Sequence, residues 1–359
     1  MKKKKGKKIV LIVLGVILLA LVVALLLQAG WGGSYKDRDG KYAHVTKNTS
    51  FQHICNHPLW NGNGQNLYSV WGNTSVGKLT GFMSLKALCH WCGWNADSAV
   101  DGTNYLIDCA NEGTCEIWNI YSDEQIRQDP HLAAAQAVYY QGDPEKPVAI
   151  VAAGGGYTSV ASFVEAYPYA EMLNKAGYPV VVLKYRVGED LIPAEDVKTA
   201  ITPKISEAAK DMLSLIRICR EKGLKLDEYS LWGSSAGGGL ITSFAFEFEG
   251  ASYEELGIPR PAALMLIYTH AKYIDKFEFT KNDPPVFTIV GVGDAYGGDE
   301  VMDRVAPRMQ AAGMDVVYHK YQKYPHGSGL GKGTDAEGWI DEAISFWESH
   351  MSKGNEESK

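Results

Sequence analysis

Residues Leu231–Leu240 read LWGSSAGGGL and place two adjacent serines inside a glycine-rich stretch. A short apolar run, Tyr229–Trp232, precedes the glycines, and the apolar, helix-like segment GGLITSFAFEF follows them. This succession predicts a strand, a tight turn and a helix. Glycines suit such a turn because the strand and helix backbones approach closely there. A phosphate-binding loop would instead need Lys followed by Ser or Thr after the glycines, and neither occurs.

The C-terminal two-thirds of the chain alternates apolar runs with amphipathic segments. This alternation predicts an α/β fold with a mostly parallel, doubly wound sheet of about eight strands and flanking helices. Several runs are continuous in Val, Ile and Leu, as expected for strands buried on both faces. The predicted strands are Glu116–Tyr121, Ala137–Gln141, Val148–Ala152, Val180–Tyr185, Tyr229–Trp232, Ala263–Tyr268, Val286–Val290 and Val316–Tyr321.

The turn itself, Gly233–Gly237, fits the pattern G-x-S-x-G with Ser235 at the central position. Between a strand and a helix this pattern is typical of a nucleophile elbow. We therefore predict Ser235 as a nucleophile. Ser234, one position earlier, is expected to point away from the site and to be structural.

A second glycine-rich loop lies upstream, where the strand Val148–Ala152 runs into AGGGY. Hydrolysis of an ester passes through a tetrahedral oxyanion, which backbone N–H groups stabilise. We predict oxyanion donors at Gly155 and Gly156, together with the N–H of Ala236.

An acid and a base follow the elbow, each after a predicted strand. Asp294 lies just beyond Val286–Val290, and His326 lies in a Pro/Gly loop. The order Ser, Asp, His predicts a catalytic triad. Asp299 and Asp303 are rival acids, and His270 is a rival base. No metal-binding motif is present, and the chemistry needs no metal or cofactor.

The N-terminus combines six lysines before residue 9 with a nonpolar run, residues 9–27. Nineteen apolar residues are long enough for a membrane-spanning helix, and the lysines favour a cytoplasmic N-terminus. We expect an exported protein anchored in the bacterial cytoplasmic membrane with its catalytic domain outside. A cleaved signal peptide, giving a secreted protein, is the alternative. The whole chain has a net charge of −7, so the rest, without the six N-terminal lysines, carries −7 − 6 = −13, and no nucleic-acid partner is expected.

Residues 31–111 are rich in Gly, Asn, Thr, Trp and Cys, with helices expected only around Leu79–Trp91 and Ser98–Cys109. The cysteine cluster suggests one or two disulfides, Cys109–Cys115 being the easiest by spacing. Zinc or redox roles for CHWC, residues 89–92, are less favoured. We expect this accessory segment to pack onto the body of the protein, meaning the α/β domain that follows it. The alternatives are a lid over the site or a surface that binds sugars. The predicted division is an anchor or signal peptide (1–30), the accessory segment (31–111), the catalytic domain (112–350) and a disordered tail (351–359).

The motifs AAGGGY, LKYRVG, LWGSSAGGGL, GVGDAY and YPHGSGLG resemble those of bacterial α/β-hydrolase esterases related to hormone-sensitive lipase and to acetyl-xylan or feruloyl esterases. The resemblance covers about residues 147–350. It implies the α/β-hydrolase fold, a triad of Ser235, Asp294 and His326, and the three oxyanion donors named above. Ala153 stands where that family usually has His or Pro, so no role of that side chain carries over.

The expected function is hydrolysis of carboxylic esters with short acyl groups, on a small molecule or an acylated carbohydrate. Two alternatives stay open. One is a serine peptidase of the prolyl-oligopeptidase type, which shares the fold and the triad. The other is a non-catalytic cell-surface protein that binds glycans through the Trp-rich segment.

Overall fold

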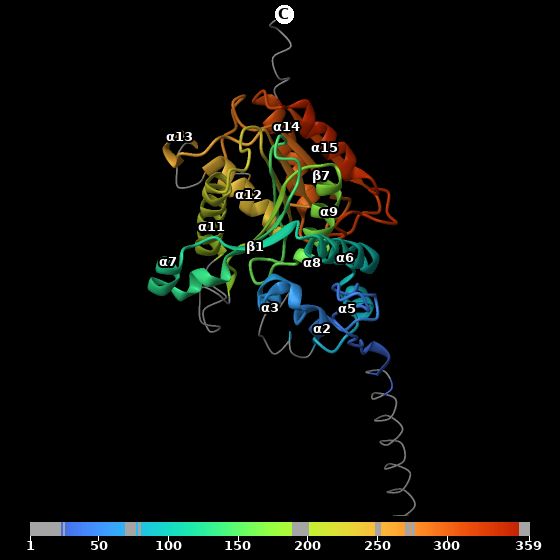
Figure 1. The fold of residues 1–359 in the computed structure, drawn as a ribbon. Coiled ribbons are helices and arrows are strands. Elements are labelled where there is room, and N and C mark those ends of the chain that lie inside the picture. The colour runs from blue at the N-terminus through green and yellow to red at the C-terminus, as the bar shows by residue number, and fades with distance from the viewer. Residues whose placement is uncertain are drawn as a thin grey trace, which may run out of the picture.

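A computed structural model describes residues 23, 26–68, 77, 80–188, 201–247, 253–269, 274 and 277–351, with only the backbone for 201–206 and 247. The predicted sheet is confirmed: eight strands lie in the order β1-β2-β4-β3-β5-β6-β7-β8 (Figure 1). Their bounds differ from the predicted ones by two residues at most. The strands are β1 Cys115–Asn119, β2 Gln136–Tyr140, β3 Ala149–Ala152, β4 Val180–Lys184, β5 Ser230–Ser234, β6 Ala263–Ile267, β7 Val286–Gly291 and β8 Val316–Tyr321.

The sheet is antiparallel at one edge and parallel elsewhere. Strand β2 runs antiparallel to both β1 and β4, whereas β4, β3, β5, β6, β7 and β8 are parallel. Every residue of β3 to β7 is buried, which explains their continuous apolar sequences. The two edge strands are partly exposed.

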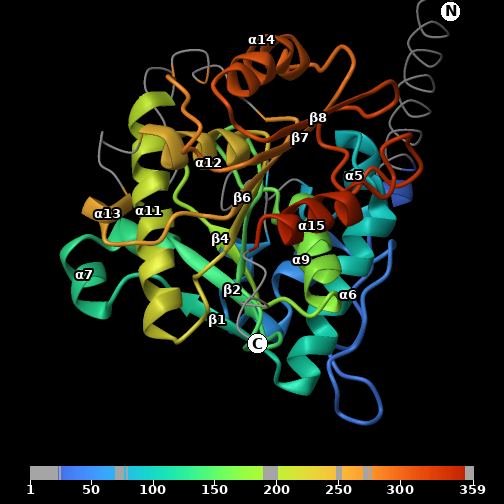
Figure 2. The same cartoon turned by 90° about the horizontal axis from the view of Figure 1, so that it is seen from above.

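Helices cover both faces of the sheet. In Figure 2, α11, α12 and α14 lie on one face, and α9 and α15 lie on the other with α6 outside them. These helices span α6 Ala96–Glu112, α9 Tyr167–Lys175, α11 Ile201–Glu221, α12 Ala236–Glu247, α14 Gly298–Ala311 and α15 Trp339–Ser349. Shorter elements are α7 Asp123–Gln128, η2 Pro130–Ala134, α8 Ser162–Glu165 and α13 Tyr253–Leu256.

Strand register brings the predicted site loops to one edge of the sheet. Ala152 at the end of β3 pairs with Gly233 of β5, so the glycine loop and the serine turn leave the sheet side by side. Gly291 at the end of β7 pairs with Tyr321 at the end of β8. The loops that carry the predicted acid and base therefore also start together.

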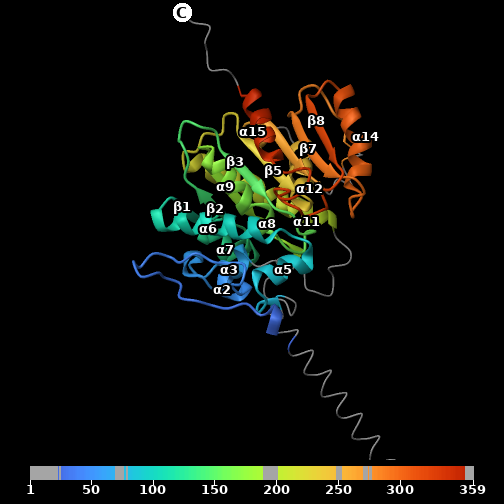
Figure 3. The ribbon, with the colours of Figure 1, turned by 90° about the vertical axis from the view of Figure 1, so that its right-hand side faces the viewer.

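The accessory segment, which includes α6, packs against this body beside α8 (Figure 3). Its other elements are α2 Phe51–Cys55, η1 Pro58–Trp60, α3 Gly64–Leu67 and α5 Leu85–Cys92. Phe51 and Tyr68 contact the Phe163 ring, and Trp60 contacts Tyr167. The helices around 79–91 and 98–109 are present as α5 and α6. The very short α2 and α3 were not predicted, because four or five residues give no helical periodicity.

The disulfide prediction is wrong, because all six cysteines are free thiols. Cys55, Cys89, Cys109 and Cys219 are buried in the hydrophobic core. Burial raises the pKa of Cys89 and of Cys115 to about 12, so these thiols stay protonated. A protonated, buried thiol behaves as a small apolar side chain rather than as a nucleophile.

Two predictions fall largely outside the described residues. They are the membrane anchor at 9–27 and the tail, of which only Met351 is described. Within the described part of the chain, no helix has the length and apolar character to cross a membrane.

Candidate active site

Ser235 occupies the strained turn between β5 and α12. Its φ is +49°, a left-handed value that is unusual for a residue with a side chain, and its N–H donates to the Ile267 carbonyl over 2.9 Å. The turn is tight enough to require glycine at Gly237, where a Cβ atom would lie 2.1 Å from the Ala152 carbonyl oxygen. The sequence pattern therefore reflects a real steric demand.

The structure brings Ser235, His326 and Asp294 together in a line. His326 Nε2 lies 2.8 Å from Ser235 Oγ, and His326 Nδ1 lies 2.8 Å from Asp294 Oδ2. With its proton on Nδ1, the imidazole donates to the aspartate and accepts from the serine hydroxyl. This is the hydrogen-bond arrangement of a nucleophile, a base and an orienting acid.

Asp294 is buried, and its second oxygen is also occupied. Asp294 Oδ1 accepts hydrogen bonds from the N–H groups of Tyr296 and Gly298. Burial by itself would raise the pKa of Asp294. The hydrogen bond and charge of His326, with the two backbone donors, outweigh burial and hold that pKa below its usual value. The carboxylate is thus kept ionised beside the imidazole.

The glycine loop presents N–H groups next to Ser235. Gly155 and Gly156 have φ values of +137° and +65°. Among the described residues, the N–H groups of Gly155, Gly156 and Ala236 have no acceptor. The Gly154 N–H, by contrast, donates to Glu165 Oε2. The three predicted oxyanion donors are therefore unoccupied by the protein itself.

Comparison with solved structures agrees with this sheet topology. The chain has the α/β-hydrolase fold. It is similar to a thermophilic esterase from the planctomycete Thermogutta terrifontis, with 17% identity over 68% of this chain and 95% of that chain, and a TM-score of 0.52. It is also similar to an acetyl ester-xyloside bifunctional hydrolase from Caldicellulosiruptor lactoaceticus. The identity is 21% over 65% of this chain and 96% of that chain, and the TM-score is 0.50. These neighbours are bacterial hydrolases, and identities this low establish the fold alone.

No protein-family model matches the chain, and no curated protein matches it in sequence.

A cavity of about 460 Å³ opens beside Ser235 and His326 of the hydrolase fold. The glycine loop forms one wall, and Tyr296, which follows Asp294, contributes to another. Cys92 and Trp94 of the accessory segment complete the lining. Sequence reasoning missed both, because their proximity to the site depends on how a separate segment docks.

Trp94 is held in place by the body. Its ring packs edge-on against Phe163 at 5.5 Å between centroids and lies close to Gly327, next to His326. The exposed Trp91, only three residues earlier, does not line the cavity. The accessory segment thus lines the cavity beside Ser235 and His326, as well as packing on the body.

The rival acids lie elsewhere. Asp299 and Asp303 both pair with Lys320, away from His326. The rival base His270 lies outside the described residues. The part of the chain that the structure describes holds no group of three or more His, Cys, Asp or Glu side chains suited to a metal ion.

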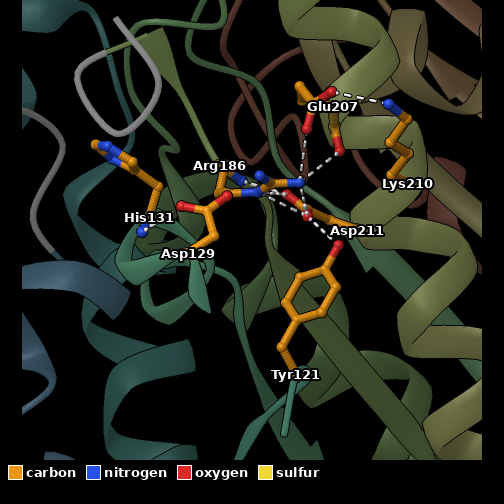
Figure 4. Close-up of polar contacts among 7 residues, drawn as sticks. All are labelled: Tyr121, Asp129, His131, Arg186, Glu207, Lys210 and Asp211. Atoms are coloured by element: carbon orange, nitrogen blue, oxygen red, sulfur yellow. Dashed lines mark hydrogen bonds and ion pairs between the residues drawn. The ribbon is translucent and has the colours of Figure 1, made fainter. Parts of the chain in front are cut away.

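A buried ion pair supports the glycine loop from behind. Figure 4 shows the Arg186 guanidinium between Asp211 and Glu207, with the Tyr121 hydroxyl directed at the Asp211 carboxylate. The Arg186 N–H also donates to Asp211. Two residues further along, the Gly188 N–H donates to the carbonyl of Tyr157, the residue that ends the glycine loop. The ion pair therefore fixes the segment against which the loop rests.

Proposed function

We propose that this chain is a serine esterase that hydrolyses carboxylic esters with short acyl groups. The observation that carries the proposal is the pair of 2.8 Å contacts that place His326 between Ser235 and Asp294. The unoccupied N–H groups beside Ser235 and the cavity in front of it give further support. The fold that the chain shares with bacterial esterases fits the same reading.

The reaction proceeds in two halves. His326 Nε2 takes the proton of Ser235 as Oγ attacks the ester carbonyl, and the oxyanion accepts hydrogen bonds from Gly155, Gly156 and Ala236. The alcohol leaves with the proton that His326 returns, and an acyl-enzyme remains. Water then attacks the acyl carbonyl while His326 takes a proton from it. The bond from the acyl carbon to Ser235 Oγ breaks as His326 returns that proton to Oγ, and the carboxylic acid is released. Asp294 holds the imidazole in the required tautomer throughout.

The acyl group is expected to be small. One solved neighbour, the Thermogutta terrifontis esterase, has been obtained with propionate and with butyrate bound, and another neighbour is named for acetyl ester and xyloside hydrolysis. Aromatic side chains at the cavity, Trp94 and Tyr296, suit the ring of an acylated sugar or of an aromatic alcohol. The substrate is therefore a small ester or an acylated carbohydrate.

A covalent probe tests the proposal directly. A fluorophosphonate should form one bond from phosphorus to Ser235 Oγ, with loss of fluoride, and peptide mass spectrometry should find the adduct on that residue. Labelling should stop in Ser235→Ala, and p-nitrophenyl acetate should protect the wild type. An adduct on another serine, or no hydrolysis of short p-nitrophenyl esters by the wild type, would refute the proposal.

We further propose that the protein is exported and anchored through residues 9–27. The exposed apolar side chains of Leu26, Leu27 and Trp31, where the described chain begins, support a membrane-proximal position for the start of the body. Protease added to intact cells should digest the body of an anchored protein. A body that resists protease until the cells are lysed would overturn this location.

A further inference from the structure

The buried Glu165 has no part in the mechanism above, yet it lines the cavity and contacts the glycine loop. Its Oε2 accepts the Gly154 N–H at 2.6 Å. Its Oε1 accepts the Tyr268 hydroxyl at 3.1 Å. The side chain therefore joins the start of the loop that carries the oxyanion donors to the residue that follows β6.

Tyr268 extends this connection to the histidine loop. Its hydroxyl accepts the N–H of Gly329, three residues after His326, at 3.0 Å. Its ring also packs against the imidazole of His326, with centroids 4.8 Å apart. The Gly329 carbonyl is held in turn by the Tyr324 hydroxyl and the Trp339 indole N–H. The base and the oxyanion loop thus share one support.

The third connection reaches the serine turn. The Tyr169 hydroxyl lies 3.0 Å from Ser234 Oγ and 3.5 Å from the Tyr268 hydroxyl. All of these side chains are buried. We call Ser234, Tyr169, Tyr268 and Glu165 the loop-linking network, since its members touch the chain next to the nucleophile, the base and the oxyanion donors.

We propose that Glu165 and Tyr268 are positioning residues for ester hydrolysis, which hold the oxyanion loop and the histidine loop in one fixed geometry. This inference rests on the proposed function. The Gly154 N–H is committed to Glu165, which fixes the peptide plane between Ala153 and Gly154, and the Gly154 carbonyl, in the next plane, accepts the Ala161 N–H. The following N–H groups at Gly155 and Gly156 then keep their direction beside Ser235. Misplacement by about 1 Å can cost roughly a hundredfold in rate, so such support has a large kinetic effect.

The electrostatics of the site fit a positioning role for this carboxyl group. Burial raises the pKa of Glu165, although the Gly154 and Tyr268 hydrogen bonds and the charge of His326 act in the opposite direction. At a given pH, the neutral acid form is therefore more populated in Glu165 than in an exposed glutamate. A raised pKa lessens the negative charge on this carboxyl group at a given pH, and with it the repulsion of the charge that develops at the oxyanion donors.

The test compares the full-length wild type with Glu165→Ala, Glu165→Gln and Tyr268→Phe, using p-nitrophenyl acetate. For Glu165→Ala we expect kcat to fall about a hundredfold with KM changed less than about threefold, since the donors act mainly in the transition state. Glu165→Gln keeps an acceptor for Gly154 and should recover kcat to within about tenfold of the wild type. Tyr268→Phe should lower kcat about tenfold.

The matched control is Tyr167→Phe. It removes an equally buried hydroxyl, which donates to the Leu67 carbonyl outside the network, and kcat should stay near the wild-type value. Normal kcat in Glu165→Ala, or an equal loss in Glu165→Gln, would overturn the positioning role. If Glu165→Ala does not fold, as judged by circular dichroism, normal kcat in Tyr268→Phe would overturn it. A wild type that hydrolyses no ester would instead refute the proposed function itself.

Discussion

Ser234 and Ser235 are neighbours in the sequence, but their hydroxyl groups have different partners. Ser235 Oγ lies 2.8 Å from His326 Nε2, whereas Ser234 Oγ lies 3.0 Å from the Tyr169 hydroxyl inside the protein. Ser234 is the last residue of β5, whereas Ser235 has the left-handed backbone of the turn, and this change in backbone conformation accounts for the separation. Only the second hydroxyl can reach the cavity.

Replacing each serine by alanine should separate the two positions. Ser235→Ala should lower kcat for p-nitrophenyl acetate on the order of a million-fold, because triad members act as a unit. Ser234→Ala should stay within about tenfold of the wild type, since it loses one hydrogen bond next to the turn. Steady-state rates of the two purified variants give the comparison. A larger loss in Ser234→Ala than in Ser235→Ala would contradict the assignment.

Asp294→Asn should lower kcat about ten-thousandfold, because an amide no longer fixes the proton on His326 Nδ1. The control is Asp303→Asn, which removes a carboxylate that pairs with Lys320 at the surface and does not contact His326. That variant should keep wild-type kcat. Equal activity of the two variants would argue against Asp294 as the orienting acid.

Trp94→Ala should change which esters are preferred, because it removes one wall of the cavity. We expect the ratio of kcat/KM for p-nitrophenyl hexanoate to that for the acetate to rise about tenfold, within the range typical of apolar pockets. Trp91→Ala is the control, as this side chain is 71% exposed and lies outside the cavity lining. An equal rise of this ratio in both variants would show that the loss of the Trp94 wall does not cause the change in ester preference.

Asp211→Asn should strongly destabilise the fold, because it leaves the buried Arg186 guanidinium without its main partner. Breaking one side of a buried ion pair costs about 3–5 kcal/mol in free energy of unfolding. Asp101→Asn breaks the half-exposed pair with Lys332 and should cost about 1 kcal/mol or less. Urea unfolding measures both. If the free energy of unfolding of Asp211→Asn falls by no more than that of Asp101→Asn, solvent reaches Arg186 and the pair is not effectively buried.

The raised pKa of Glu165 predicts a pH-dependent stability difference. A carboxyl group whose pKa is higher in the folded state stabilises the protein below its unfolded pKa, near 4.5, and that contribution is lost as pH rises through the folded value. Glu165→Gln lacks this loss, so its free energy of unfolding should increase relative to wild type as pH rises from about 4.5 to 7. The contributions of all other carboxyl groups are the same in both proteins, so they cancel in the difference between the two free energies of unfolding. A constant difference across this range would contradict the shift.

Much of the fold could be predicted from the sequence because its signals are local. All eight predicted strands are present, and burial of β3 to β7 along their whole length accounts for their mostly apolar sequences. The tight turn at Ser235 could also be predicted from its glycines, because Gly237 has no room for a Cβ atom. The disulfides predicted from the clustering of the cysteines were wrong, because the cysteines are free thiols and most of them lie in the apolar core.

The sequence by itself determined the strands, the strained serine turn and the order of Ser235, Asp294 and His326 along the chain. Only the tertiary structure decided that Trp94 lines the cavity and that Glu165 and Tyr268 connect the loops. The physical reason is the range of the interactions. Strand periodicity and turn sterics act between near neighbours, whereas a cavity wall and a buried hydrogen-bond network join residues that meet only after the sheet has formed.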